Sequence, residues 1–437
     1  MIALEFLVVL AAILIGARIG GIGLGVMGGL GLAVLTFGFG LRPTNAPIDV
    51  MLMIVAVITA AACLQVAGGM DWLVRQAERL LRRNPRQITW YAPLVTYGFT
   101  LCAGTGHVAY AVLPVIAEVA REAGVRPERP LSIAVIASQV AITASPISAA
   151  TVALLSLLAG RGVELAHILM IAIPATLCGV AAGALVASRL GPELEHDPVY
   201  QARLAAGQVA PPHRGELQPL PARARHAVAI FLLAAITVVL LGSLPALRPA
   251  WQVDGQLQTL NMASVIEIVM LSAAALILLT ARVPAEQVVK GSVFRAGAAA
   301  VIGIFGVAWM GDTFIQANMA FFSGEIRATV AAAPWLFAVA LFAMSILLYS
   351  QAATIRALMP LGIALGLPTP ALIAMFPAVN GYFFIPNYPT VIAAINFDAT
   401  GTTRIGRWLL NHSFMLPGLA CSVVAVGSGF ALAHLLA

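Results

Sequence analysis

Two short stretches place small and polar residues inside otherwise apolar segments, one in each half of the chain. The first spans 104–114 and the second spans 350–360, and each passes from small or polar residues through an apolar run to a proline. A further proline element follows each of them, at Ser145-Pro146 and at 385–389. Polar, Gly- and Pro-broken sequence at matching places in two halves is typical of a transporter's binding site. We therefore predict a secondary transporter whose substrate binds where these elements meet.

The side chains of these elements favour an anionic substrate. None is a carboxylate, and helix ends, hydroxyls and amides supply N–H and O–H donors. Arg356 is costly at membrane depth and suits a bidentate carboxylate contact, with snorkelling or pairing with an acid as the alternatives. His107 is a candidate to hydrogen-bond substrate or carry a proton, or else a packing histidine. The predicted substrate-binding residues are Gly104, Thr105, Gly106, His107, Thr143, Ser145, Pro146, Ser350, Gln351, Thr354, Arg356, Asn387, Pro389 and Thr390.

The composition is that of a multi-pass membrane protein. Of the 437 residues, 61% are apolar and only 10% are charged, whereas soluble domains carry about a quarter charged residues. The net charge of +6 comes from basic residues in short loops between apolar runs. This placement argues against a basic patch that binds nucleic acid. It predicts instead a chain whose apolar runs are embedded in a lipid bilayer. The four cysteines all lie in apolar segments without metal spacing, so we expect neither a metal site nor a disulfide.

The apolar runs predict an all-α fold of about ten transmembrane helices plus two re-entrant hairpins, arranged as two inverted repeats. The first repeat spans 1–188 and the second spans 226–437, and a cytoplasmic linker at 189–225, rich in proline and charge, is expected to lack a fixed fold. The hairpins are expected at 88–120 and 334–366, and broken helices with their ends near the midplane at 131–159 and 371–395. The remaining spans are expected at 2–17, 20–40, 48–69, 165–188, 226–245, 261–281, 297–311 and 412–436.

Three further segments have a predicted role in this layout. Residues 71–84 alternate apolar and basic positions with helical spacing, which predicts an amphipathic helix at the membrane surface. Gly21, Gly25 and Gly29 fall on one face of the second span and predict a close approach of another helix. Residues 312–333 are expected to form a surface segment. Asp398 and the following 400–403 run are expected in an inside loop, as a turn or cap or as a gate or regulatory contact.

The placement of the basic residues tests the layout. With both termini in the periplasm, the predicted inside loops hold 19 of the 24 basic residues. The predicted outside loops hold four, which are Arg42, Arg161, Arg248 and Arg327, and Arg356 is the one left within a membrane segment. This asymmetry follows the positive-inside rule. An odd number of spans in each half then gives the two halves opposite orientations, as an inverted repeat requires.

Other classes of function find less support in the sequence. An intramembrane enzyme would need a nucleophile and base or a set of metal ligands at membrane depth, and the sequence holds neither a His-Glu-x-x-His nor a Gly-x-Ser-x-Gly motif. A carrier of another organic anion, coupled to Na⁺ or H⁺ through freed carbonyls, stays open. A role as a sensor, or contact with a membrane sensor protein, would be secondary. No cofactor is expected.

Several stretches resemble the Dcu family of bacterial C4-dicarboxylate transporters, nearest to its DcuA branch. They are ARIGGIGLGVMGGLG (17–31), LQVAGGMDWL (64–73), LLRRNPRQIT (80–89), AGTGHVAYAVLPVIAEVA (103–120), ITASPISAA (142–150), LLYSQAATIRALMP (347–360) and DATGTTRIGRW (398–408). The resemblance implies exchange of fumarate, succinate, malate and aspartate across the inner membrane. It also implies the ion-transporter superfamily fold, a homodimer and an elevator movement. Members of the Dcu family typically carry lysine at the place of Arg356 in this sequence. Arginine keeps the positive charge there but changes the geometry of its hydrogen bonds.

Overall fold

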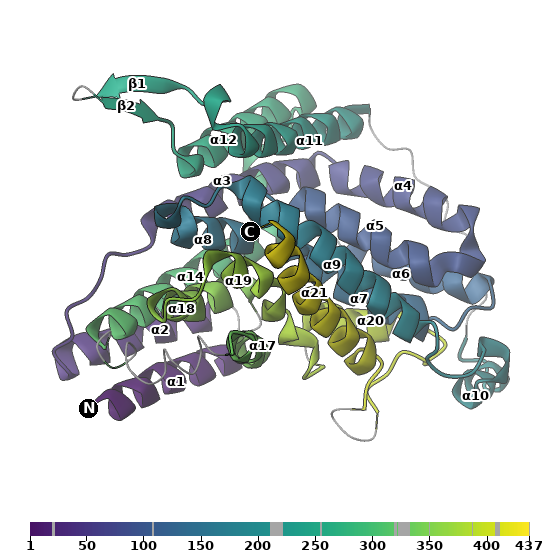
Figure 1. Cartoon of the computed structure of the whole chain (residues 1–437). Helices are drawn as coiled ribbons and strands as arrows, with labels where there is room; N and C mark the ends of the chain where they lie inside the picture. Colours follow the sequence, from purple (N-terminus) through teal and green to yellow (C-terminus); the bar gives the residue numbers. More distant parts are fainter. Residues whose placement is uncertain are drawn as a thin grey trace.

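The computed structural model describes residues 1–19, 22–106, 109–209, 222–253, 256–318, 321, 333–348, 350–386, 388–406 and 411–436. These residues form a mainly helical molecule of long helices packed side by side, with a two-stranded sheet at its edge (Figure 1). The predicted helical class is confirmed. It is wrong in one respect, because Ala250–Val253 (β1) and Gln256–Thr259 (β2) pair as an antiparallel ribbon that the sequence analysis missed.

The first half divides at its glycines and prolines. Its helices are α1 (Ile2–Ile19), α2 (Gly23–Ala33) with the π-helix η1 (Val34–Gly38), α3 (Ile48–Val66), α4 (Gly69–Arg83), α5 (Ile88–Ala103), α6 (Ala109–Glu122), α7 (Glu128–Val140), α8 (Ala149–Leu158) and α9 (Leu165–Ala187). The chain bends by 70° between α3 and α4 at Gly68, whose φ of 79° suits glycine alone. The amphipathic helix expected at 71–84 is therefore present as α4, which buries Ala77 and Leu81.

The second half is also mainly helical. Its helices are α11 (Ala222–Ser243), α12 (Met262–Ala281), α13 (Ala285–Lys290), α14 (Ser292–Ala317), α17 (Trp335–Leu348), α18 (Gln351–Ala364), α19 (Thr369–Ala374), α20 (Pro389–Phe397) and α21 (Met415–Leu436). Between α19 and α20 the chain forms two 3₁₀ turns, η8 (Phe376–Val379) and η9 (Gly381–Phe383). The expected surface segment at 312–333 is wrong at its start, since α14 continues to Ala317. Residues 319–320 and 322–332 lie outside the described residues.

The expectation that residues 189–225 lack a fixed fold is wrong for the first part of that linker. Leu194–His196 forms the 3₁₀ turn η6, and Pro198–Ala205 forms helix α10. The Asp197 carboxylate caps α10 by accepting hydrogen bonds from the Val199 and Tyr200 N–H groups, both at 2.9 Å. Residues 210–221 lie outside the described part of the chain.

Close helix packing depends on glycine at one crossing. α2 packs on α14, and a Cβ at Gly25 would overlap the backbone carbonyl of Ile302. Gly28 similarly faces the backbone of Gly306, so the backbones of the two helices touch. The predicted glycine face is thus right at Gly25 but wrong at Gly29, beside which a Cβ would meet nothing within 4 Å; Gly21 lies outside the described residues.

Helix length and composition agree with a membrane protein. Among the described residues, five helices are long and apolar enough to cross a bilayer, at 165–187, 223–242, 262–281, 293–317 and 415–435. Shorter apolar helices occur at 2–13, 25–38, 149–161 and 335–346, and α3 with α4 forms a bent pair. The count of ten spans and the orientation of the termini stay predictions.

Candidate functional site

Three buried amide side chains from distant parts of the chain meet at the centre of the candidate site. Gln351, the first residue of α18, donates from Nε2 to Asn380 Oδ1 at 3.1 Å and to Gln139 Oε1 at 3.4 Å. Gln139 lies in the last turn of α7, and Asn380 lies between η8 and η9. All three side chains are buried. We call Gln139, Gln351 and Asn380 the amide cluster.

The start of α18 positions Gln351. Ser350 is the N-cap, and its hydroxyl accepts a hydrogen bond from Ala353 N–H at 3.2 Å. Thr354 donates from its hydroxyl to the Ser350 carbonyl at 2.8 Å, so this hydroxyl is committed to the backbone. The first turn of a helix carries unpaired N–H groups and a partial positive charge. Gln351 therefore sits beside a backbone environment that favours an anion.

The tip of the first hairpin packs directly on the amide cluster. Gly104 ends α5 with a φ of 71°, and a Cβ there would lie 2.9 Å from the Ile147 carbonyl oxygen. At Gly106 a Cβ would overlap Gln139 Nε2, so only glycine leaves this amide in place. Thr105 borders a cavity of about 110 Å³ that the backbone of the tip shares with α3 and α8. His107 lies outside the described residues.

At the break between α7 and α8, side-chain hydroxyls form hydrogen bonds with backbone carbonyls of the break and of α5. Thr143 donates from Oγ1 to the Val140 carbonyl at 2.7 Å, and Ser145 donates from Oγ to the Leu101 carbonyl of α5 at 2.8 Å. Pro146 is buried beside them. A helix break inside a membrane needs such substitutes for its lost backbone hydrogen bonds. The hydroxyls of Thr143 and Ser145 thus hold the break and the hairpin together, and a contact of either with substrate stays a prediction.

The second break is held in a similar way. Asn380 donates from Nδ2 to the Pro377 carbonyl at 2.9 Å, and Gly381 N–H donates to Ser345 Oγ of α17 at 2.8 Å. Pro389 occupies the first position of α20. The Thr390 hydroxyl in the same turn is buried and makes no hydrogen bond within the part of the chain that the structure describes. Asn387 lies outside that part.

Arg356 is buried in the second turn of α18, and its charge has a counterpart in the protein. The Asp312 carboxylate on α14 interacts electrostatically with Arg356, and α14 packs against α18. A charge at membrane depth is normally balanced in this manner. This long-range attraction is compatible with the alternative in which Arg356 is balanced by an acid, and a contact with substrate stays a prediction.

Gln351 was predicted from the sequence as a substrate-binding residue, whereas its two partners in the amide cluster were not. Gln139 and Asn380 each lie a few residues before a proline break, and each is the one amide in a run of mainly small and apolar residues. That isolation was an available signal, since a buried amide needs hydrogen-bonding partners. Their pairing was not available, because Gln139 and Gln351 are 212 positions apart.

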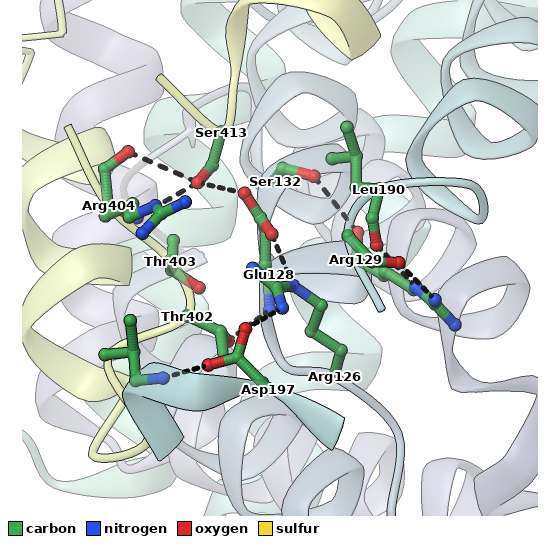
Figure 2. Close-up of polar contacts among 12 residues, drawn as sticks. Arg126, Glu128, Arg129, Ser132, Leu190, Asp197, Thr402, Thr403, Arg404 and Ser413 are labelled. Atoms are coloured by element: carbon green, nitrogen blue, oxygen red, sulfur yellow. Dashed lines mark hydrogen bonds and ion pairs between the residues drawn. The ribbon is translucent and has the colours of Figure 1, made fainter. Parts of the chain in front are cut away.

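A second buried network joins three loops at the opposite end of the molecule from the β-ribbon (Figures 1 and 2). Arg126 donates from Nε to Glu128 Oε2 at 2.5 Å and also pairs with Asp197 of the linker. Glu128 accepts from Ser413 Oγ at 2.6 Å, and its N–H donates to Thr402 Oγ1 at 3.2 Å. The loop before α7, the linker and the loop between α20 and α21 are therefore tied together. We call Arg126, Glu128 and Asp197 the linker latch.

Asp398 organises the loop on the far side of this latch. Its carboxylate accepts hydrogen bonds from Thr400 N–H at 2.9 Å, from Thr402 Oγ1 at 2.8 Å and from Thr403 N–H at 2.6 Å. Arg203 of α10 donates to the Ala399 carbonyl at 3.1 Å. The expected turn at 398–403 is confirmed, and it also contacts the linker.

Comparisons with known proteins identify the family of this chain. The family model described as "Anaerobic c4-dicarboxylate membrane transporter" (DcuA_DcuB) matches residues 1–437. The chain is 45% identical over 434 residues to the C4-dicarboxylate transporter DcuA of Escherichia coli strain K12, with 99% of each chain covered. It is 45% identical to DcuA of Wolinella succinogenes, with both chains fully covered, and 39% identical to the anaerobic C4-dicarboxylate transporter DcuB of Escherichia coli O6:H1, with 95% of each covered.

The chain belongs to the DcuA/DcuB family. It is therefore a membrane transporter and not an enzyme. Its fold is similar to that of the Alcanivorax borkumensis YdaH transporter, with a TM-score of 0.57, 16% identity and coverage of 95% of this chain and 98% of that one. It is also similar to Neisseria gonorrhoeae MtrF, with a TM-score of 0.56, 12% identity and coverage of 92% and 84%. Because the sequence identities are only 16% and 12%, these two likenesses establish a shared fold and nothing further about this protein.

Proposed function

We propose that this protein exchanges C4-dicarboxylates, namely fumarate, succinate, malate and aspartate, across the bacterial inner membrane. The observation that carries the proposal is the amide cluster, in which the second hairpin meets both broken helices and the first hairpin tip touches Gln139. Amides and helix N-termini are donors that suit carboxylates without supplying a competing negative charge. The named relatives, which are C4-dicarboxylate transporters, support the same substrate class.

We further propose that the two halves are inverted repeats. Helix α2 packs on α14, and α3 packs on α12; α1 packs on α2, and α11 packs on α12. If α1, α2 and α3 correspond in order to α11, α12 and α14, the α2–α14 contact corresponds to the α12–α3 contact. The α1–α2 contact then corresponds to the α11–α12 contact. Helices α9 and α21, the last of each half, pack on one another. Such exchange of partners is what a two-fold relation between repeats produces, and it supports the proposal.

An elevator movement is the mechanism we propose for this arrangement. One apolar cluster joins α5, α6 and α7 with α20, and a second joins α3, α11 and α12 with α14, α8 and α18. Helices α8 and α18 would therefore slide along the surface of the second cluster when the unit moves. Both hairpins and both breaks contact the amide cluster, so a substrate bound there would be carried by them as a unit. Movement of that unit against α2, α3, α12 and α14 would expose the site to alternate sides.

Exchange in proteoliposomes tests the proposal. Labelled succinate is supplied outside, with unlabelled fumarate or no dicarboxylate inside, in Na⁺ and in Na⁺-free buffer. We expect uptake that requires internal dicarboxylate and is indifferent to Na⁺. Uptake into empty vesicles driven by a Na⁺ gradient would refute exchange, and absence of transport of all four acids would refute the substrate class.

Gln351→Leu links this activity to the amide cluster. The substitution keeps the approximate volume of the side chain and removes both hydrogen bonds, and it leaves Asn380 and Gln139 with unpaired groups. We expect exchange to fall at least tenfold with normal amounts of protein in the membrane. Gln201→Leu, in the linker on an exposed face of α10, is the matched control. Equal exchange by the two variants would place the substrate elsewhere.

A further inference from the structure

A cavity of about 520 Å³ opens at the end of the molecule that carries the β-ribbon. It lies between α3, α8 and the starts of α9 and α12, and its polar lining includes Glu164, Arg248 and Asn261. Its volume falls within the roughly 300–1,000 Å³ that is usual for small-molecule sites. The arginine distribution predicts this end to be the outer one, because Arg161 and Arg248 are two of the four basic residues in predicted outside loops.

Arg248 is the main charge of this cavity, and its bonding is incomplete. Its side chain is 14% exposed, and Nη2 lies 3.7 Å from Glu164 Oε1, which is an ion pair without a hydrogen bond. Its Nε is buried and makes no hydrogen bond within the described residues. A buried guanidinium normally uses its fork of donors on a carboxylate or a carbonyl. Because Arg248 lines the cavity and Glu164 holds Nη2 only through this long ion pair, the guanidinium can bind a carboxylate that enters the cavity.

Two helix starts add to the positive potential of the cavity. Glu164 is the N-cap of α9 and Asn261 is the N-cap of α12, and both line the cavity. Asn261 accepts a hydrogen bond from Ser264 N–H at 2.9 Å through Oδ1, which leaves its amide nitrogen as the donor group. Helix N-termini carry partial positive charge. Glu164 opposes this potential, and it is the group that an incoming carboxylate would displace from Arg248.

The cavity lies next to the tip of the first hairpin. Val152 of α8 lines both this cavity and the smaller one that borders Thr105. The two spaces therefore meet at the same segment of α8. A ligand held by Arg248 would be one step from the hairpin tip that touches the amide cluster.

We propose that this cavity is an outer vestibule in which Arg248 binds one carboxylate of the incoming dicarboxylate. The inference rests on the proposed function, since it names an entry site for the same substrates. Arg248 selects the anion and Glu164 tunes its affinity by competing for the same guanidinium. Because Glu164 already satisfies part of Arg248, the vestibule holds substrate weakly enough to release it inward.

Opposite effects of two substitutions test this role. Arg248→Gln removes the cation, and we expect the KM for external succinate to rise about tenfold with little change in the maximum rate. A tenfold change in KM corresponds to the loss of about one charge-assisted hydrogen bond. Glu164→Gln removes the competitor, and we expect the external KM to fall. Arg42→Gln, an exposed outside arginine away from the cavity, is the matched control and should leave KM unchanged.

The side of the membrane provides the second readout. Uptake is measured in intact cells and in inside-out vesicles, and the Arg248→Gln increase in KM should occur only in intact cells. An equal increase from both sides, or equal loss of activity in Arg248→Gln and Glu164→Gln, would show that the ion pair is merely structural and overturn the proposal. Unchanged external KM would overturn it as well, while leaving exchange intact. A wild-type chain that carries no C4-dicarboxylate would refute both the inference and the proposed function.

Discussion

Replacement of Asp197 by asparagine should release α10 from the loops that it contacts. Asparagine is nearly isosteric and caps a helix as well as aspartate does, so the cap on Val199 and Tyr200 should survive. The contact that is lost is the ion pair with Arg126, whose side chain is 3% exposed while that of Asp197 is 5% exposed. The substitution therefore isolates the contribution of the linker latch.

The expected magnitude follows from the burial of the pair. A hydrogen bond to a charged group contributes about 1.5–3 kcal/mol, and screening by water is small at this depth. Arg126 keeps its second partner, Glu128, so the larger penalty of an unpaired buried charge is avoided. A loss of about 2 kcal/mol raises the undocked fraction of α10 about thirtyfold.

Limited trypsin digestion measures that fraction. The Arg203 side chain contacts the Ala399 carbonyl when α10 is docked, so cleavage after Arg203 requires undocking. When opening is fast relative to cleavage, the cleavage rate follows the open population, and we expect an increase of about thirtyfold in Asp197→Asn. Glu195→Gln, which makes the same charge change on an exposed neighbour, is the control. Equal cleavage rates in the two variants would refute the reasoning.

Acid provides an independent check on the same carboxylate. Burial alone would raise the pKa of Asp197, but hydrogen bonds from Tyr200 N–H, Arg126 and Val199 N–H outweigh it and lower the pKa below 3.8. A carboxyl whose pKa is lowered in the folded state stabilises it fully above its ordinary pKa and loses that contribution as the pH falls through the lower value. We expect hydrogen exchange of the α10 amides to differ between wild type and Asp197→Asn at neutral pH and to converge below pH about 3.8.

Two glycine substitutions, each with a matched control, test the remaining packing arguments. Gly106→Ala should displace the Gln139 amide. Because this amide is the movable end of a side chain, we expect normal amounts of protein but at least a tenfold fall in exchange. Gly98→Ala on α5 is the control, since a Cβ there meets open space and exchange should be unchanged. Full exchange by Gly106→Ala would contradict the contact between hairpin tip and amide cluster. Gly25→Ala would overlap the Ile302 carbonyl, and separating the helices should cost about 1–3 kcal/mol, read as a lower Tm in detergent. Gly29→Ala should leave Tm unchanged, and a similar shift in both variants would disprove the crossing.

Much of the helical architecture was predictable from the sequence because its signals are local. Gly104 ends α5, Ser350 caps α18 and Pro389 begins α20, each at a place where the residue type itself forbids or favours a helical turn. The interruptions at 104–106, 143–146, 350–351 and 385–389 were predicted from small, polar and proline residues inside apolar runs, and the re-entrant course of the two hairpins stays a prediction. The polar tips also drew attention to Gln351, since an amide is unfavourable in an apolar span unless it is paired, and its role in substrate binding stays a prediction.

Local signals misled the prediction where long-range contacts outweigh them. The linker has the proline and charge content of an unstructured segment, yet its pairing with Arg126 and the cap at Asp197 fold residues 194–205. The β-ribbon at 250–259 depends on cross-strand pairing, which a run of four residues does not reveal.

The sequence by itself determined which segments are apolar helices, where they break and that the breaks carry neutral donors instead of carboxylates. Only the tertiary structure decided which polar groups meet. Gln351 pairs with Asn380 and Gln139, Asp312 interacts electrostatically with Arg356, and Arg248 forms an ion pair with Glu164 in the cavity beside the β-ribbon. The reason is physical: a backbone turn is set by neighbouring residues, whereas the partner of a buried polar group is any residue that packing brings within about 3 Å.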